Sequence, residues 1–218
     1  MPNPADLRLD YQHATLSLAD LAPSPLIQFQ TWFDAAVAAK VAEPNAMTLA
    51  TVDNYQQPDA RIVLLKYMDG EKLGFYTNYH SQKATQIAQN PYCSIVFLWA
   101  AQERQVRIKA RLAPMDKKTS TDYFQSRPLD SQLAAWASPQ SQPITDRQEL
   151  ENYWTAAQQL HAGQNPLPLP PHWGGYFILP HRFEFWQGRS SRLHDRFIYT
   201  LTNTENPLSG WTISRLAP

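Results

Sequence analysis

The chain has 218 residues, and its 19 Lys and Arg residues balance its 19 Asp and Glu residues to a formal net charge of +0. This length suits one domain with a substantial core. A neutral chain is not drawn as a whole to nucleic acid or an anionic membrane, so any cationic site must be local. The single cysteine, Cys93, excludes an internal disulfide, and residues 1–10 contain no apolar signal segment. We therefore expect a cytoplasmic protein without a membrane helix.

The first elements in chain order are an arm and a helix. Residues 1–22 are polar and irregular, which predicts a flexible N-terminal arm followed by one domain over residues 23–218. Ser24 and Pro25 are typical of an N-cap and a first helical position. Apolar residues then recur at helical spacing to about Lys40. They are Leu26, Phe29, Phe33 and Val37.

The rest of the chain consists mainly of strand-like runs separated by turns. The expected strands are Met47–Val52, Ala60–Tyr67, Lys72–Thr77, Tyr92–Trp99, Arg104–Leu112, Gly175–Leu179, Arg182–Trp186, Leu193–Thr200 and Gly210–Arg215. The expected helices are Ser81–Gln89, Asp116–Ser126 and Asp146–His161, and the prolines of residues 163–171 predict extended loop. Consecutive strands with short turns favour an antiparallel sheet that closes on itself, with helices outside. No βαβ alternation or G-x-G-x-x-G supports a Rossmann fold.

Two candidate sites lie at the ends of the early strands. Arg61 and Lys66 bracket the apolar residues 62–65, and simple alternation places the two cations on opposite faces. Further along, a strand ends near Thr77 and a helix capped by Ser81 follows, with Lys83 in its first turn. The free N–H groups of such a turn suit a phosphate. A solvated edge strand and an ordinary capped helix explain the same patterns without a ligand.

Two more candidate sites combine arginine with other polar side chains. Tyr123 and Arg127 are one helical turn apart and converge with Ser131 near a helix end, which suits an anion. The alternative is an arginine that interacts with the helix dipole. Arg192 and His194 alternate with Arg196, so we expect all three on one strand face. Burying them is costly without an anionic or polar ligand, although a solvated face remains possible.

Other chemistries lack support in the sequence. One cysteine and six scattered histidines give no zinc spacing, and we expect no metal site. No G-x-S-x-G or P-loop is present. Cys93 lies in an apolar strand, which favours a core residue over a nucleophile.

Several short motifs, in their residues and in their order along the chain, resemble those of the pyridoxine/pyridoxamine 5'-phosphate oxidase family, from about residue 8 to residue 218. The stretches are RIVLLK at 61–66, FYTN at 75–78, ERQV at 103–106, YFQSRPLDSQ at 123–132, WGG at 173–175, EFWQG at 184–188, RLHDRF at 192–197 and the final RLAP at 215–218. The resemblance implies a split β-barrel homodimer with FMN at the subunit interface. It also implies oxidation of pyridoxamine and pyridoxine 5'-phosphates to pyridoxal 5'-phosphate by molecular oxygen, releasing hydrogen peroxide.

The resemblance also implies roles for individual residues. FMN would be bound by Arg61, Ile62, Val63, Leu64, Leu65, Lys66, Tyr76, Thr77, Gln82, Lys83, Gln105, Gln140, Ser141, Trp186 and Arg196. Gln105 would come from the other subunit. The substrate would be bound by Arg8, Tyr11, Lys66, Tyr123, Arg127, Ser131, Arg192, Leu193 and His194, with Arg192 and His194 catalytic.

Three positions depart from the family pattern. Gln82 stands where arginine is frequent, which weakens the expected grip on the FMN phosphate. Leu9 follows Arg8 where the family often has consecutive basic residues, and the turn at Asn54–Gln57 lacks a glycine. The alternative functions are another split-barrel flavin oxidoreductase and a non-catalytic FMN or pyridoxal-phosphate binding protein.

Overall fold

The protein is built around one antiparallel sheet, seen in a computed structural model that describes residues 3–7, 10–203 and 210–218. The strands are β1 (Ala46–Val52), β2 (Pro58–Leu64), β3 (Tyr67–Met68), β4 (Leu73–Asn78), β5 (Tyr92–Trp99), β6 (Arg104–Pro114), β7 (Trp173–Gln187), β8 (Asp195–Leu201) and β9 (Trp211–Leu216). The helices are α1 (Pro25–Ala38), α2 (Gln82–Gln89), α3 (Lys117–Ser126), α4 (Leu129–Ala137) and α5 (Arg147–Leu160). Short 3₁₀ turns are η1 (Pro4–Asp6), η2 (Leu18–Asp20), η3 (Ala100–Gln102) and η4 (Ser190–Arg192).

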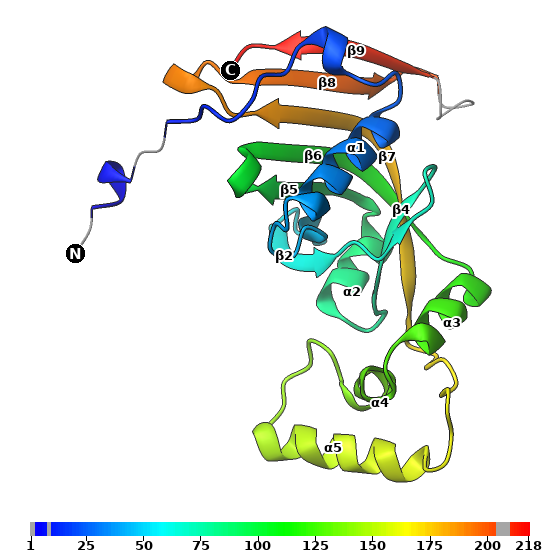
Figure 1. Ribbon diagram of the computed structural model, residues 1–218. Helices are drawn as coiled ribbons and strands as arrows, with labels where there is room; N and C mark the ends of the chain where they lie inside the picture. The colour runs from blue at the N-terminus through cyan, green and yellow to red at the C-terminus, as the bar shows by residue number, and fades with distance from the viewer. Residues whose placement is uncertain (1–2, 8–9, 204–209) are drawn as a thin grey trace.

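The strand order is β2-β1-β5-β6-β7-β4-β3, and β8 and β9 extend the sheet beyond β7. All recorded pairings are antiparallel, so the predicted mainly β architecture with flanking helices is confirmed (Figure 1). These pairings form an open path from β2 to β3. The strand pattern predicted a sheet that closes on itself, and this is wrong for the backbone ladder of the described residues. The split barrel that the resemblance implies is confirmed.

The predicted strands on either side of Pro180 are one strand, β7. Proline lacks the N–H that a central ladder needs, which is why the sequence predicts a break there. The pairing of β6 with β7 instead shifts register between Lys109 and Ala110, opposite Pro180 and Arg182. This bulge absorbs one residue and lets the strand continue. As a result, β7 pairs with β4 in its first half and with β8 in its second half.

The main core lies between the sheet and α1, which crosses one face of the sheet (Figure 1). Leu26 and Phe29 of α1 are buried, as helical spacing predicts, whereas Phe33 is half-buried and Val37 is 50% exposed. Trp32, which the predicted spacing did not include, is buried as well. Phe29 packs against Phe97 of β5 with ring centroids 5.0 Å apart, and Trp32 packs edge-on against Phe185 of β7 at 5.2 Å. Burial of these large rings contributes much of the hydrophobic free energy of folding.

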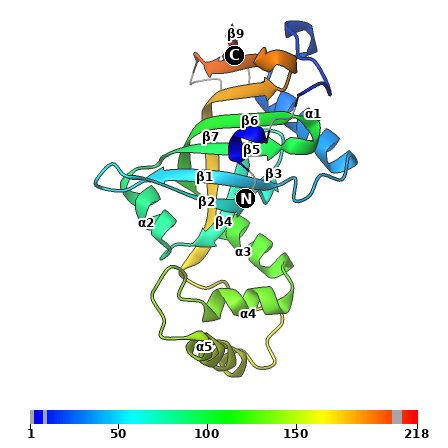
Figure 2. The ribbon, with the colours of Figure 1, turned by 90° about the vertical axis from the view of Figure 1, so that its left-hand side faces the viewer.

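A second, smaller core lies under α3, α4 and α5, at the end of the sheet away from β8 and β9 (Figure 2). It contains Phe124, Leu133, Leu167 and Trp173. The sequence analysis missed α4, which begins directly after Pro128 and buries only Gln132, Leu133 and Ala135. A nine-residue helix shows too few periods of apolar residues to be recognised.

Two expected strand placements are wrong. β8 begins at Asp195, so Arg192 and His194 are not on a strand face beside Arg196. Arg192 belongs to η4 and has a left-handed backbone with φ 62°. Likewise β2 ends at Leu64, and the exposed Lys66 lies between β2 and β3 with its backbone N–H bonded to the Gly74 carbonyl. Alternation along a strand therefore does not decide where these side chains point.

Within the described part of the chain, no helix has both the length and the apolar character needed to cross a membrane.

We expect Leu49→Ala to lower the free energy of unfolding by about 2–5 kcal/mol, because Leu49 is 0% exposed and its loss leaves a cavity in the main core. The matched change Leu160→Ala, at a residue 71% exposed at the end of α5, should stay within about 0.5 kcal/mol. Urea unfolding at one protein concentration measures both. Equal effects would contradict this account of the core.

Candidate functional site

A first cationic site lies where β2, β4 and α2 meet. Lys83 Nζ donates to Gln140 Oε1 at 3.0 Å and to Thr77 Oγ1 at 3.4 Å. The Thr77 hydroxyl also donates to Gln140 Oε1, at 3.2 Å. Ser81 caps α2 as the sequence predicts, since its hydroxyl accepts the Ala84 N–H. We call Arg61, Thr77, Lys83 and Gln140 the β4–α2 cradle.

Arg61 belongs to this cradle through its charge. Its guanidinium donates to Asp59 at 2.6 Å, Thr51 Oγ1 at 2.6 Å and Gln86 Oε1 at 3.1 Å. Burial lowers the pKa of Lys83, and the positive charge of Arg61 lowers it further, whereas Asp59 partly offsets both effects. The negative charge of Asp59 only partly offsets the two positive charges of Arg61 and Lys83. The site therefore favours an anion as ligand.

A second site lies on the other side of β4. Tyr76 stacks on Tyr123 of α3 with ring centroids 3.9 Å apart, and it stacks on Trp173 of β7 at 5.4 Å. Gly175 permits this packing, because a Cβ there would lie 2.9 Å from the Tyr76 ring. Burial raises the pKa of Tyr76 to about 12, so its hydroxyl stays protonated near neutral pH.

Arg127 completes this second site, which we call the aromatic cluster (Tyr76, Tyr123, Arg127 and Trp173). Its guanidinium lies over the Trp173 ring, 4.9 Å from the centroid. Burial lowers the pKa of Arg127, and one nitrogen, NH1, is buried without a hydrogen-bond partner among the described residues. An unsatisfied buried guanidinium nitrogen is costly. The cost disappears if an anionic ligand accepts its hydrogen bond.

A third group forms at the far end of β7. The rings of Trp186 and His194 lie 4.6 Å apart, and the Arg189 N–H donates to His194 Nδ1 at 3.1 Å. With Nδ1 as the acceptor, the neutral ring carries its proton on Nε2. Arg192 and Leu193 are exposed beside this pair. A cavity next to this group is lined by Tyr11, Arg189, Arg192 and His194, together with Leu7 and Asp10.

Trp186 also belongs to a row across the sheet. Gln105 of β6 pairs with Trp186, and Trp186 pairs with Arg196 of β8, so the three residues share one face. Arg196 Nε and NH2 donate to Glu184 at 3.0 and 2.8 Å, and NH1 donates to the Ala217 carbonyl at 2.8 Å. The guanidinium is thus fixed in place by the chain itself.

The remaining predicted residues are placed as follows. Ile62 and Leu64 are exposed on β2, Val63 is half-buried, and Leu65 is buried. Gln82 is exposed in the first turn of α2. Ser131 lies in α4, and Ser141 is exposed with a left-handed φ of 69°. Arg8 and Leu9 lie outside the described residues.

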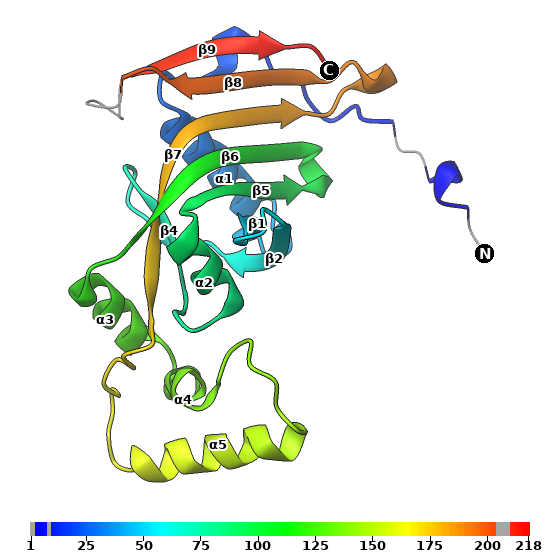
Figure 3. The same ribbon diagram turned by 180° about the vertical axis from the view of Figure 1, so that it is seen from behind.

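The third group does not meet the other two sites within one chain. Trp173 and Trp186 stand at opposite ends of β7, which at about 3.3 Å per residue is up to about 43 Å of strand. Figure 3 shows the same separation, with α3 at one end of the molecule and the β7–β8 connection at the other. The predicted site residues therefore form two half-sites, one at each end.

Solved structures define the class of fold. The chain matches PhzG from Burkholderia lata with a TM-score of 0.84 and 26% identity, over 94% of this chain and 98% of that one. It matches an FMN-binding, pyridoxamine 5'-phosphate oxidase-related protein from Nostoc punctiforme with a TM-score of 0.70, over 91% and 99% of the two chains. At 19% identity, that second likeness shows the fold alone. The class is the split-barrel proteins.

Sequence comparisons define the family. Residues 33–160 match the model of pyridoxamine 5'-phosphate oxidase, and residues 173–218 match the pyridoxine 5'-phosphate oxidase C-terminal dimerisation region. Pyridoxine/pyridoxamine 5'-phosphate oxidase 1 from Ralstonia nicotianae is 51% identical over the whole of both chains. The Acaryochloris marina relative of that name is 49% identical over 98% of this chain and 95% of its own. The chain belongs to the pyridoxamine 5'-phosphate oxidase family of oxidoreductases.

Several residues of these sites were not predicted individually. Trp173 was noted as part of a motif, but its stacking in the aromatic cluster was not foreseen. Asp59 and Gln86 hold Arg61, and Glu184 holds Arg196. Asp59 lies two residues from Arg61 on the same strand, so alternation could have suggested that the two side chains share a face. The other two partners, Gln86 and Glu184, leave no signal in the sequence.

We expect Lys83→Met to raise the unfolding temperature of the FMN-free protein at pH 7. The pKa of Lys83 is lowered in the fold, so the charged form destabilises the fold at neutral pH, and this penalty vanishes only as pH rises above the unfolded-state pKa. Calorimetry of the apoprotein measures the change. Lys118→Met removes an exposed lysine paired with Asp122 and serves as the control. A lower unfolding temperature for Lys83→Met than for the control would refute the assignment.

Proposed function

We propose that this protein oxidises pyridoxamine and pyridoxine 5'-phosphates to pyridoxal 5'-phosphate, with FMN as cofactor and molecular oxygen as acceptor, in the cytoplasm. The observation that supports this most is the placement of two anion sites on either side of β4. Thr77 points into the β4–α2 cradle, whereas the preceding residue, Tyr76, points into the aromatic cluster. Cofactor and substrate each carry one phosphate, and the chain offers one cationic site for each.

The residues present fit FMN. The cradle offers the guanidinium of Arg61, the ammonium of Lys83 and the hydroxyl of Thr77 at the start of a capped helix, which is the donor set that a phosphate prefers. Gln82 adds a neutral amide where a further cation would strengthen binding. The proposal also assigns the exposed β2 face, from Ile62 to Leu64, to the flavin ring.

The second site then holds the substrate. The NH1 group of Arg127 would donate to the substrate phosphate, supported by the protonated hydroxyl of Tyr123. The proposal adds Lys66 and Ser131 as further donors to that phosphate. When bound, FMN would accept a hydride from C4' of the substrate and pass the two electrons to oxygen as hydrogen peroxide. With pyridoxamine 5'-phosphate, water would then hydrolyse the imine product to the aldehyde and ammonia. The protein supplies position and charge. Arg192 would steer C4', and His194 would donate a hydrogen bond from Nε2.

The arrangement requires two copies of the chain. Four of the proposed site residues lie at the opposite end of the molecule from the cradle: Gln105, Trp186, Arg192 and His194. They could reach a flavin bound at the cradle only from a partner chain. The match of residues 173–218 to a dimerisation region supports a homodimer. Its two sites would each combine the cradle of one protomer with the β7–β8 connection of the other.

The function is tested by the visible spectrum of the purified protein under anaerobic conditions. Addition of pyridoxamine 5'-phosphate should bleach the flavin band, and admission of oxygen should restore it with release of one peroxide per turnover. A colourless protein that binds no added FMN would refute the cofactor assignment. A yellow protein that stays oxidised would favour a non-catalytic binding protein or another flavin oxidoreductase.

We expect Arg127→Ala to raise the KM for pyridoxamine 5'-phosphate by a factor that corresponds to about 1.5–3 kcal/mol, because a charge-assisted contact is lost. FMN affinity should be unchanged, since Arg127 belongs to the aromatic cluster and not to the cradle. Steady-state kinetics with a flavin titration measures both. Loss of FMN with an unchanged KM would mean that the two phosphates are assigned the wrong way round.

We also expect the FMN content to follow the association state. Dilution should release FMN as dimers dissociate, because Gln105 and Trp186 would reach the flavin only from the partner. Light scattering together with flavin fluorescence follows both quantities. A monomeric mass with FMN fully bound would contradict the shared site.

A further inference from the structure

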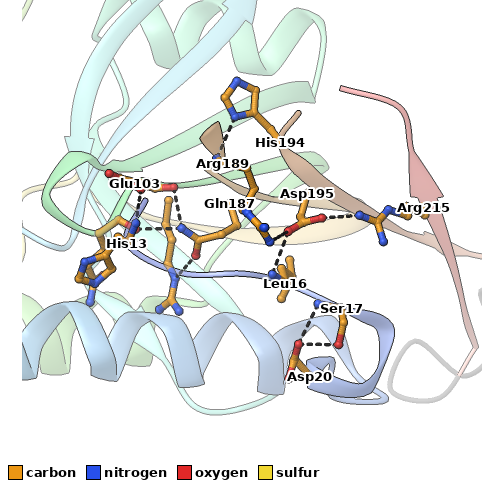
Figure 4. Close-up of polar contacts among 12 residues, drawn as sticks. His13, Leu16, Ser17, Asp20, Glu103, Gln187, Arg189, His194, Asp195 and Arg215 are labelled. Carbon is orange, nitrogen blue, oxygen red and sulfur yellow. Dashed lines mark hydrogen bonds and ion pairs between the residues drawn. The ribbon is translucent and has the colours of Figure 1, made fainter. Parts of the chain in front are cut away.

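The ERQV stretch begins with Glu103, a residue that has no role in the function proposed above. Glu103 follows η3 and has a left-handed backbone with φ 53°. Its carbonyl oxygen accepts the Gly188 N–H at 2.7 Å. It also accepts the side-chain amide of Gln187 at 3.2 Å (Figure 4). The backbone of Glu103 is therefore fixed beside the start of the connection between β7 and β8, residues 188–194, which carries Arg192 and His194.

The side chain of Glu103 points to a different segment. Its carboxylate accepts the Gln12 N–H at 3.3 Å and the His13 N–H at 2.9 Å (Figure 4). In the described ranges, these are the hydrogen bonds that the carboxylate makes. Both come from residues 10–22, which we call the N-terminal strap. A carboxylate that receives two neighbouring backbone N–H groups holds that stretch of backbone in one orientation.

The anchored stretch places Tyr11 directly over the third group. The Tyr11 ring lies 5.7 Å from Trp186, at 90°, and 5.8 Å from His194, at 60°. Gly188 allows Tyr11 and Glu103 to pack closely here, because a Cβ at 188 would lie 2.8 Å from Tyr11 Cγ and 2.9 Å from Glu103 Cβ. A side chain at 188 would displace the Tyr11 ring or the Glu103 side chain.

The strap has a second anchor on the other side of the connection. The Leu16 N–H donates to Asp195 Oδ2 at 3.1 Å, and Asp195 also pairs with Arg189 and Arg215 (Figure 4). The Leu16 side chain is buried in the main core. Since Asp195 holds Arg189 as well as the strap, its substitution would disturb the connection directly. Glu103 is the anchor whose side chain can be changed without removing a bond within residues 188–194.

We propose that Glu103 is a positioning residue: its carboxylate fastens the strap so that Tyr11 closes over His194 and the substrate ring. The inference rests on the proposed function for its effect on turnover, but the fastening itself is a property of the chain. Glu103 is not among the proposed ligands of cofactor or substrate, and it would act through the backbone of Gln12 and His13.

Hydrogen exchange in the FMN-loaded protein tests the fastening without turnover. Glu103→Gln keeps the shape of the side chain but removes its charge and one acceptor oxygen, so the amides of residues 11–13 should exchange about tenfold faster or more. The matched control is Asp20→Asn. Asp20 also accepts two hydrogen bonds in the strap, and both come from Ser17 of the strap itself. Unchanged exchange at residues 11–13 in Glu103→Gln, or an equal rise in Asp20→Asn, overturns the proposal.

Kinetics then test the route of action. Glu103→Gln should raise the KM for pyridoxamine 5'-phosphate on the order of tenfold with kcat within about twofold, and Asp20→Asn should leave both unchanged. In Tyr11→Ala, adding Glu103→Gln should have little further effect on KM, because both changes remove the same contact. Additive effects would mean that Glu103 acts elsewhere and would overturn the proposal. A protein without oxidase activity that still shows the exchange difference would refute the function alone.

Discussion

The rest of the structure depends on the uninterrupted pairing of β7. This one strand joins the small helical core at Trp173 to the connection that follows Gln187, and it pairs with β4, β6 and β8 on the way. The bulge opposite Pro180 is what allows the ladder to continue past a residue that cannot donate. Because one strand carries both half-sites, the distance between them is fixed by backbone hydrogen bonds.

The two sides of β4 separate two chemistries by the simplest rule of strand geometry. Tyr76 and Thr77 are consecutive, so one side chain enters a stack of aromatic rings and the other enters a cradle of cations. Each site contains a group that destabilises the fold. In the first it is the desolvated ammonium of Lys83, and in the second it is the guanidinium nitrogen of Arg127 that has no partner among the described residues. Such costs are common where a ligand supplies the missing partner.

The sequence was sufficient for the fold class, for most strands and for the helices with several apolar periods. It failed at α4, which is short, and at Pro180, where a bulge in the neighbouring strand overrides a local rule. It also misplaced Arg192 and His194, because η4 replaces the expected strand with a left-handed turn. The proposed site residues were predicted from residue patterns and from the resemblance. The residues that bind and orient them, such as Asp59, Glu184 and Glu103, depend on pairings across the sheet that spacing along the chain does not reveal.

The separation of the half-sites has a genetic consequence. In the proposed dimer, a chain with a damaged cradle still contributes a sound β7–β8 connection, and a chain damaged at that connection still contributes a sound cradle. Two such defective alleles in one cell would form mixed dimers in which one of the two sites is assembled entirely from undamaged halves. Harmful substitutions at opposite ends of β7 should therefore complement each other, whereas two at the same end should not.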